Sequence, residues 1–142
     1  MRHIAPVNIK KCDGRSSSSY GELKALVQDD VDGGFLVKEL ALLLPDVMIC
    51  GSTSVFLEMV AEKYRGHGIE TSWKNGAELK SRGFGFLKLE AAGDAHHILV
   101  IDAYHPSYFV IGFNLWYYYL CGIVGAAEAE SPAWRRQVSN KS

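Results

Sequence analysis

The chain has 142 residues, enough for one domain with a buried core that needs neither a disulfide nor a metal. Hydrophobic residues make up 48% of it and charged residues 22%, which is ordinary for a soluble globular protein. Lys and Arg number 15 against 16 Asp and Glu, so the net charge of −1 excludes a general electrostatic footprint for nucleic acid. DNA binding would have to rest on a local cluster such as Lys10, Lys11 and Arg15.

The first half of the chain predicts one strand and two helices. We expect a strand over 3–9, a polar loop over 13–19 and a short helix over 20–27. A second helix follows three aspartates that favour its positive end, and Pro45 ends it. Its core-facing stripe is predicted to consist of Leu36, Leu40, Leu43 and Leu44.

The second half predicts three strands and two helices. A short buried strand over 47–50 leads through a glycine turn into a helix whose buried face contains Val55, Phe56, Met59 and Val60. A strand is expected within 84–90, with a turn at Ala92-Gly93-Asp94. After a buried strand over 98–101, residues 108–124 predict a helix packed on the sheet rather than a membrane span, because this uncharged stretch is short of the ~20 apolar residues that a span needs.

This order of elements predicts an α/β fold: a three-layer sandwich with a small, mostly parallel central sheet. We expect one domain over 1–125 and a frayed polar tail over 126–142, where Ala, Glu, Ser, Pro and Arg predominate. The three cysteines, Cys12, Cys50 and Cys121, are odd in number and widely spaced, which argues against a disulfide framework or a zinc site. Reduced thiols and a polar amino terminus predict a cytoplasmic protein without a cofactor.

The histidines are the other candidates for chemistry. His96 and His97 are neighbours at the start of the predicted strand, so their side chains point to opposite faces and cannot chelate one metal unaided. We interpret them as surface residues at the strand entry. His105 differs because Pro106 stops the strand just after it, which presents His105 at the carboxyl end of a buried strand. In open α/β sheets, ligands bind at that edge.

Three segments together resemble the uracil-DNA glycosylase superfamily. They are the corner Tyr104-His105-Pro106-Ser107-Tyr108, the strand and glycine turn over 45–53, and the asparagine segment over 7–12. Their order matches the order in the family, and the similarity runs from about Ile4 to Leu120. The resemblance implies a DNA partner, uracil-containing or single-stranded, and no membrane. It also implies hydrolysis of the bond between a flipped base and its sugar.

The resemblance assigns a role to each matched residue. Asn8 would read the edge of the flipped base, because an amide offers both a donor and an acceptor. His105 would stabilise the negative charge that develops on the departing pyrimidine. Pro106, Ser107, Gly51 and Ser52 would contact DNA phosphates, and Tyr108 would fill the gap left by the flipped base.

Each residue also has a structural interpretation. Asn8 can bond backbone in a turn, His105 can make an ordinary loop hydrogen bond, Tyr108 can belong to the core, and Gly51 with Ser52 can simply begin a helix.

One part of the family pattern has no counterpart here. In the family, a glycine-proline motif that positions the attacking water precedes the asparagine strand, and only seven residues precede Asn8. We therefore expect a domain that is incomplete at its amino terminus, with glycosylase activity left open. The alternative is a non-catalytic or truncated relative that acts as an interaction or structural domain.

Overall fold

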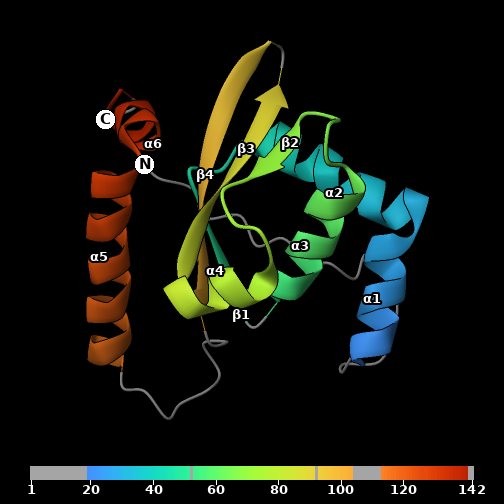
Figure 1. The fold of residues 1–142 in the computed structure, drawn as a ribbon, viewed down its shortest axis with the longest axis horizontal. Helices are drawn as coiled ribbons and strands as arrows, with labels where there is room; N and C mark the ends of the chain where they lie inside the picture. The colour runs from blue at the N-terminus through green and yellow to red at the C-terminus, as the bar shows by residue number, and fades with distance from the viewer. Residues whose placement is uncertain (1–18, 52, 92, 104–112, 141–142) are drawn as a thin grey trace.

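A computed structural model describes residues 19–51, 53–91, 93–103 and 113–140 (Figure 1). These residues form an α/β fold with six helices and one four-stranded sheet. In chain order the elements are α1 (Tyr20–Gln28), α2 (Asp30–Leu43), β1 (Val47–Gly51), α3 (Ser54–Lys63), β2 (Ile69–Thr71), α4 (Gly76–Arg82), β3 (Phe84–Ala91), β4 (Asp94–Ala103), α5 (Phe113–Glu130) and α6 (Pro132–Ser139).

The sheet has the strand order β1-β4-β3-β2 and is mixed. Only β1 and β4 pair in parallel; β3 pairs antiparallel with both β4 and β2. The expectation of a mostly parallel sheet is therefore wrong for the described strands. The reason is the connection: β3 ends at Ala91 and β4 begins at Asp94, and so short a link can join only antiparallel strands, since parallel strands need a long crossover.

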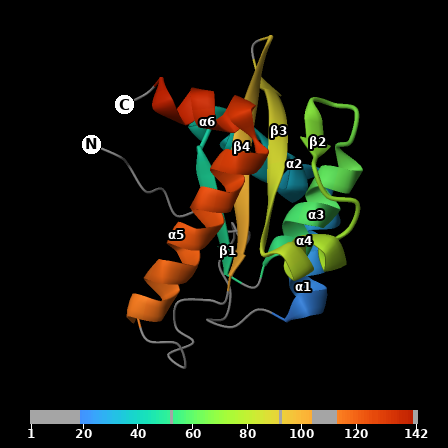
Figure 2. The same cartoon turned by 60° about the vertical axis from the view of Figure 1, so that its left-hand side comes forward.

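Helices cover both faces of this sheet. Figures 1 and 2 show α5 and α6 on one side and the four earlier helices on the other. The central strand β4 alternates between the two sides: Ile98 and Val100 belong to a buried cluster with Leu40 of α2, whereas Leu99 and Ile101 belong to a second cluster with α5 and α6. β4 is apolar on both faces over 98–101 because each face is buried under helices.

The predicted helices of the first half are confirmed, with one change in the buried stripe. Leu36 and Leu40 are buried, but Leu43 is 41% exposed. α2 ends at Leu43, and Leu44 adopts a positive φ of 40° that turns the chain toward β1. The predicted continuation of the stripe to Leu43 and Leu44 is therefore wrong: Leu43 is the last helical residue and its side chain stays exposed, and Leu44 lies beyond the end of the helix.

The chain beyond Gly125 is helical rather than a frayed tail. α5 continues to Glu130, and α6 begins after Ser131, whose hydroxyl oxygen accepts a hydrogen bond from the Trp134 backbone N–H. Trp134 is only 2% exposed and packs against the α5 side of the sheet, with its ring 6.2 Å from that of Phe86. One buried indole thus docks a segment whose composition looks polar. Within the described ranges, no helix is long and apolar enough to cross a membrane.

Candidate functional site

The predicted site lies where β1 and β4 end. The two strands run in parallel, and their register pairs Gly51 with Ala103. Gly51 leads into the glycine turn, and Ala103 is followed by the segment Tyr104–Tyr108. Of the predicted site residues, the structure therefore places Gly51 at this edge. The others, Asn8, Ser52, His105, Pro106, Ser107 and Tyr108, lie outside the described residues.

The local sequence keeps both strands in register up to this edge. β1 and β4 are rich in Val, Ile and Leu, and they stay in register from Val47 opposite Leu99 to Gly51 opposite Ala103. The helix α3 begins at Ser54, three residues after Gly51, with Thr53 at its N-cap position. Two chain segments thus leave the same edge of the sheet from neighbouring strands.

Two further elements form hydrogen bonds with the backbone at the end of β4. The backbone N–H of Asp102 donates to the carbonyl oxygen of Gly83, at 2.9 Å. Gly83 ends α4 in a left-handed conformation with φ of 76°. The hydroxyl of Tyr119, on α5, donates to the Asp102 carbonyl oxygen at 3.3 Å. The end of α4 and the middle of α5 therefore hold the backbone of Asp102 from two sides.

Asp102 is the residue at this edge whose charge the sequence reasoning overlooked. It is half-buried and lies opposite Cys50 in the parallel register, so the two side chains are on the same face of the sheet. Burial, and then the Asp102 carboxylate, raises the pKa of the Cys50 thiol to about 12. Cys50 is thus held as a neutral thiol and is unsuited to nucleophilic chemistry at neutral pH. The sequence feature that could have identified Asp102 is its position as a lone carboxylate directly after the apolar run Ile98–Ile101.

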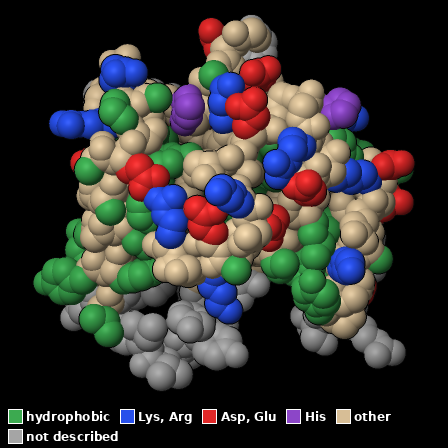
Figure 3. All heavy atoms as spheres, viewed as in Figure 1, with side chains coloured by type: hydrophobic (Ala, Val, Ile, Leu, Met, Phe, Trp, Pro, Cys, Tyr) green, Lys and Arg blue, Asp and Glu red, His purple; other side chains and the backbone are tan. Residues whose placement is uncertain are grey.

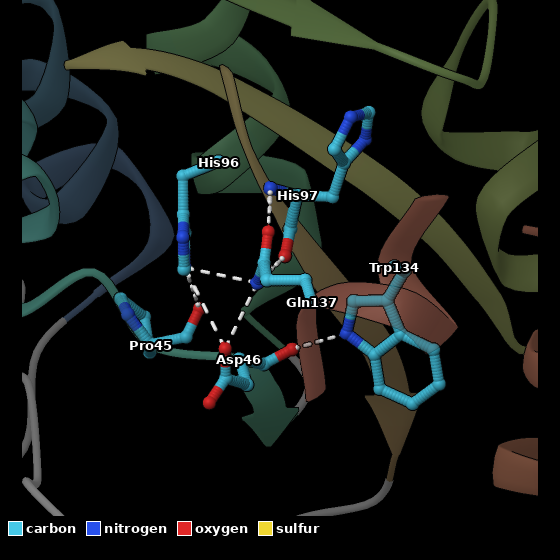
Figure 4. Close-up of polar contacts among 6 residues, drawn as sticks. All are labelled: Pro45, Asp46, His96, His97, Trp134 and Gln137. Atoms are coloured by element: carbon cyan, nitrogen blue, oxygen red, sulfur yellow. Dashed lines mark hydrogen bonds and ion pairs between the residues drawn. The ribbon is translucent and has the colours of Figure 1, made fainter. Parts of the chain in front are cut away.

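The opposite end of β4 carries a hydrogen-bonded cluster (Figure 4). The side-chain amide of Gln137 pairs with the backbone of His97: its Oε1 accepts from the N–H at 2.8 Å, and its Nε2 donates to the carbonyl oxygen at 2.9 Å. Nε2 also donates to Asp46 Oδ1 at 2.9 Å, and the Trp134 indole N–H donates to the Asp46 carbonyl oxygen at 2.8 Å. α6 is therefore tied to both parallel strands where they begin.

The geometry of the cluster explains its purpose. β1 joins β4 only from Val47 opposite Leu99, so β4 at His97 has no neighbouring strand on that side among the described residues. The amide of Gln137 takes the place of that strand and satisfies backbone groups that would otherwise be unpaired.

The histidine rings at this end separate as predicted, but the interpretation of His96 as a surface residue is wrong, because its side chain is only 11% exposed. His96 Nε2 lies 3.1 Å from the Pro45 carbonyl oxygen, which is a hydrogen bond in the tautomer that carries the proton on Nε2, and 3.8 Å from Asp46 Oδ1. The His97 ring points away from this cluster in Figure 4. Its pKa is lowered by burial and by the neighbouring charges of Lys88 and His96. Within the described part of the chain, no group of three or more His, Cys, Asp or Glu side chains could hold a metal ion.

A hollow of about 710 Å³ lies elsewhere, and Gly51, the predicted site residue that the structure describes, is not among its lining residues. Its walls combine side chains of both charges with one methionine, and the Lys63 ammonium there pairs with Asp30 at 2.7 Å. The hollow is lined by Gln28, Glu58, Met59, Glu62, Lys63 and Lys74.

Similarity to known proteins adds no further assignment to this site. Comparisons of the chain with protein-family models, with curated proteins and with solved structures found no match.

Proposed function

We propose that this chain is a uracil-DNA glycosylase-like domain that binds DNA and a flipped uracil-type base at the carboxyl edge of β1 and β4. One observation carries the proposal. Gly51 and Ala103 are register partners at the ends of neighbouring parallel strands, so the turn after Gly51 and the His105-Pro106-Ser107 corner leave from the same edge. Parallel strands present their carboxyl ends together, and this edge is where open α/β sheets bind ligands.

The proposed chemistry follows from what the base needs. When the glycosidic bond breaks, negative charge develops on the pyrimidine, and a donor already aimed at its oxygen stabilises that charge in a site from which water is excluded. His105 is the proposed donor, and Asn8 is the proposed reader of the base edge. Ser52, Ser107 and backbone N–H groups near them would hold phosphates, with Tyr108 filling the space left by the base.

The proposal extends to the finer architecture. α5 and α6 on one face and α1 to α4 on the other would be the outer layers of a three-layer sandwich. The β1–β4 pair would be its functional part, and the β3–β4 hairpin with β2 would widen the sheet on the side away from the site. This division is consistent with the order of the strands, in which β1 and β2 lie at opposite edges.

The charges of the described residues limit how DNA can be held. Several basic side chains of the described residues are ion-paired: Lys63 with Asp30, Arg65 with Glu62, and Lys88 with Glu70. Figure 3 shows Lys and Arg interspersed with Asp and Glu on the face that it presents. Binding would therefore depend on a few contacts near the site, together with Lys10, Lys11 and Arg15, and its salt dependence would be shallow.

The test is uracil release from a single-stranded oligonucleotide that contains uracil. Removing the proposed charge-stabilising donor with His105→Ala should lower the rate by about 10²–10³-fold. Asn8→Ala should also lower it, and His67→Ala, at an exposed histidine outside the site, should leave it unchanged. A folded wild-type protein that neither releases uracil nor binds the oligonucleotide at low salt contradicts the proposal.

The second candidate is a non-catalytic interaction domain, and the surface of α5 favours it. Leu115 is 64% exposed and Tyr118 is 71% exposed, with Tyr117 beside them on the same helix. Large apolar side chains grouped on a surface are typical of interaction sites. Binding of uracil-containing single-stranded DNA that weakens with His105→Ala supports the first candidate, whereas unchanged binding in that variant supports the second.

A further inference from the structure

The outer edge of β1 is open in the described part of the sheet. β1 is an edge strand, with β4 on one side and no other described strand on the other. The Leu99 N–H donates to the Asp46 carbonyl oxygen at 3.0 Å, so the backbone groups of alternate residues from Asp46 onward face β4. The N–H and C=O groups of Val47, Ile49 and Gly51 therefore face away from the sheet and are available to a further strand.

The side chains of β1 show the same incomplete coverage. Met48 and Cys50 pack into the buried cluster under α2 and α3. Val47 and Ile49, on the other face, are 41% and 45% exposed, and the buried cluster under α5 and α6 contains residues of β3 and β4 but none of β1. An exposed apolar edge strand invites pairing with another strand, so proteins usually cover it.

We propose that residues His3–Ile9 pair with the open edge of β1 as a fifth strand parallel to it. This segment carries Ile4, Val7 and Ile9, and the sequence predicts it as a strand. The pairing itself is independent of the proposed enzymatic function, because it rests on the backbone edge and on the exposed side chains of β1.

The direction follows from where the described chain begins. The ring of Tyr20, in the first turn of α1, lies 5.4 Å from the ring of Phe56, in the first turn of α3. α3 starts just after Gly51, so the chain enters the described fold near the carboxyl end of β1 (Figure 2). A strand parallel to β1 ends at that same end. Parallel neighbours also need a long crossover, and α1 and α2 supply it.

Pro6 determines which backbone groups of the segment face β1. Proline has no N–H, so within a sheet it is confined to positions whose N–H would face solvent. The backbone groups of Ala5 and Val7 then face β1. In the register that sets Ile4 opposite Val47 and Pro6 opposite Ile49, Asn8 lies opposite Gly51. The pairing would thus bring Asn8 to the carboxyl edge. Only the role of Asn8 in reading a base there rests on the proposed function.

Amide hydrogen exchange tests the pairing in the full chain. The N–H groups of Ile49 and Gly51 should exchange slowly in the wild type. Val7→Pro removes a donor that faces β1, and it should speed their exchange at least tenfold while the Leu99 N–H stays protected. Ser17→Pro, outside the segment, is the control and should change neither. Fast exchange of both amides in the wild type overturns the proposal. Protection that survives Val7→Pro and rises with protein concentration also overturns it, because a second copy would then be the partner.

A cross-link keeps the test decisive if Val7→Pro fails to fold. Opposed residues of neighbouring strands lie within the Cα separation that a disulfide accepts. In a background with Cys12→Ser and Cys121→Ser, the pair Ile4→Cys and Val47→Cys should form a disulfide on mild oxidation. The control pair Ile4→Cys and Glu70→Cys, with Glu70 on the far strand β2, should not form one. Equal cross-linking in both pairs, or none in the first, contradicts the proposal. Neither readout depends on uracil release, so the two proposals can fail separately.

Discussion

The two ends of β4 are held in different ways. At the amino end, side chains of α6 bond to the strand and to its neighbour: Gln137 pairs with the backbone of His97, and Trp134 donates to Asp46. At the carboxyl end, the contacts between described residues are a backbone hydrogen bond from Asp102 to Gly83 and one long hydrogen bond from the Tyr119 hydroxyl to Asp102. The first end is anchored by a helix far away in sequence. At the carboxyl end, two chain segments leave the sheet from the same edge.

The difference separates stability from function. The buried indole of Trp134 contributes to stability chiefly by its packing, and the Gln137 amide contributes because its removal would leave the His97 N–H and carbonyl oxygen without their partner. A binding site needs groups that are free to contact a ligand, and these are more easily provided where segments leave the sheet. We therefore expect substitutions at the amino end of β4 to lower the free energy of unfolding, and those at its carboxyl edge to act first on binding.

Trp134→Ala should have the largest effect on stability. It removes a side chain that is almost completely buried against Phe86 and that donates a hydrogen bond to Asp46. Truncation of a buried aromatic costs about 3–5 kcal/mol of the free energy of unfolding. Urea denaturation followed by circular dichroism measures it. Trp134→Phe keeps most of the packing and should cost less; a cost below about 1 kcal/mol for the alanine variant would show that α6 does not anchor β4.

Gln137→Ala should lower the free energy of unfolding by about 1–3 kcal/mol, because it leaves the N–H and carbonyl oxygen of His97 without their partner. Arg136→Ala, at the exposed neighbouring position, is the control and should change the free energy of unfolding by less than about 0.5 kcal/mol. The same denaturation experiment gives both values. Equal effects of the two substitutions would refute the role assigned to the Gln137 amide.

Gly83→Ala tests the carboxyl end of β4. It should lower the free energy of unfolding by about 1–2 kcal/mol, since the Gly83 backbone is in the left-handed conformation. An added Cβ would also lie 2.9 Å from the Tyr119 hydroxyl oxygen. Gly122→Ala, in α5, is the matched control: its Cβ would meet nothing within 4 Å, and alanine should stabilise the helix by about 0.5–1 kcal/mol. Thermal unfolding of the two variants should therefore shift in opposite directions, and a shift in the same direction would be evidence against the strain at Gly83.

The smallest expected effect is a pH dependence of the free energy of unfolding, caused by His97 near the amino end of β4. The pKa of His97 is lowered from its ordinary value of 6.5, so between the two values the unfolded chain binds more protons than the native protein. The contribution of His97 to stability is therefore complete above about pH 6.5 and is lost as the pH falls through its native pKa. Unfolding measured across this range should show a smaller loss of stability in His97→Gln than in the wild type. Parallel curves for the two proteins would contradict this assignment.

Local patterns in the sequence predicted much of the fold. Residues 47–50 and 98–101 are short apolar runs, and both are strands. Pro45 follows a helix, as expected, and the turn signal at Ala92-Gly93-Asp94 marks a hairpin. These predictions depend on the preferences of neighbouring residues, which the sequence displays directly. The candidate site was predicted as an edge after β4, and the parallel pairing of β1 with β4 agrees with that edge.

The sequence by itself determined the apolar runs of β1 and β4, the positions of the helices α1, α2 and α3, and the segments that leave the sheet near Gly51 and Ala103. Only the tertiary structure decided the mixed strand order, the docking of α6 and the pairing of Gln137 with His97. The physical reason is distance along the chain. Gln137 and His97 are 40 residues apart, and Trp134 and Asp46 are 88 apart. No local pattern can show that such groups meet, because their contact depends on how every element between them packs.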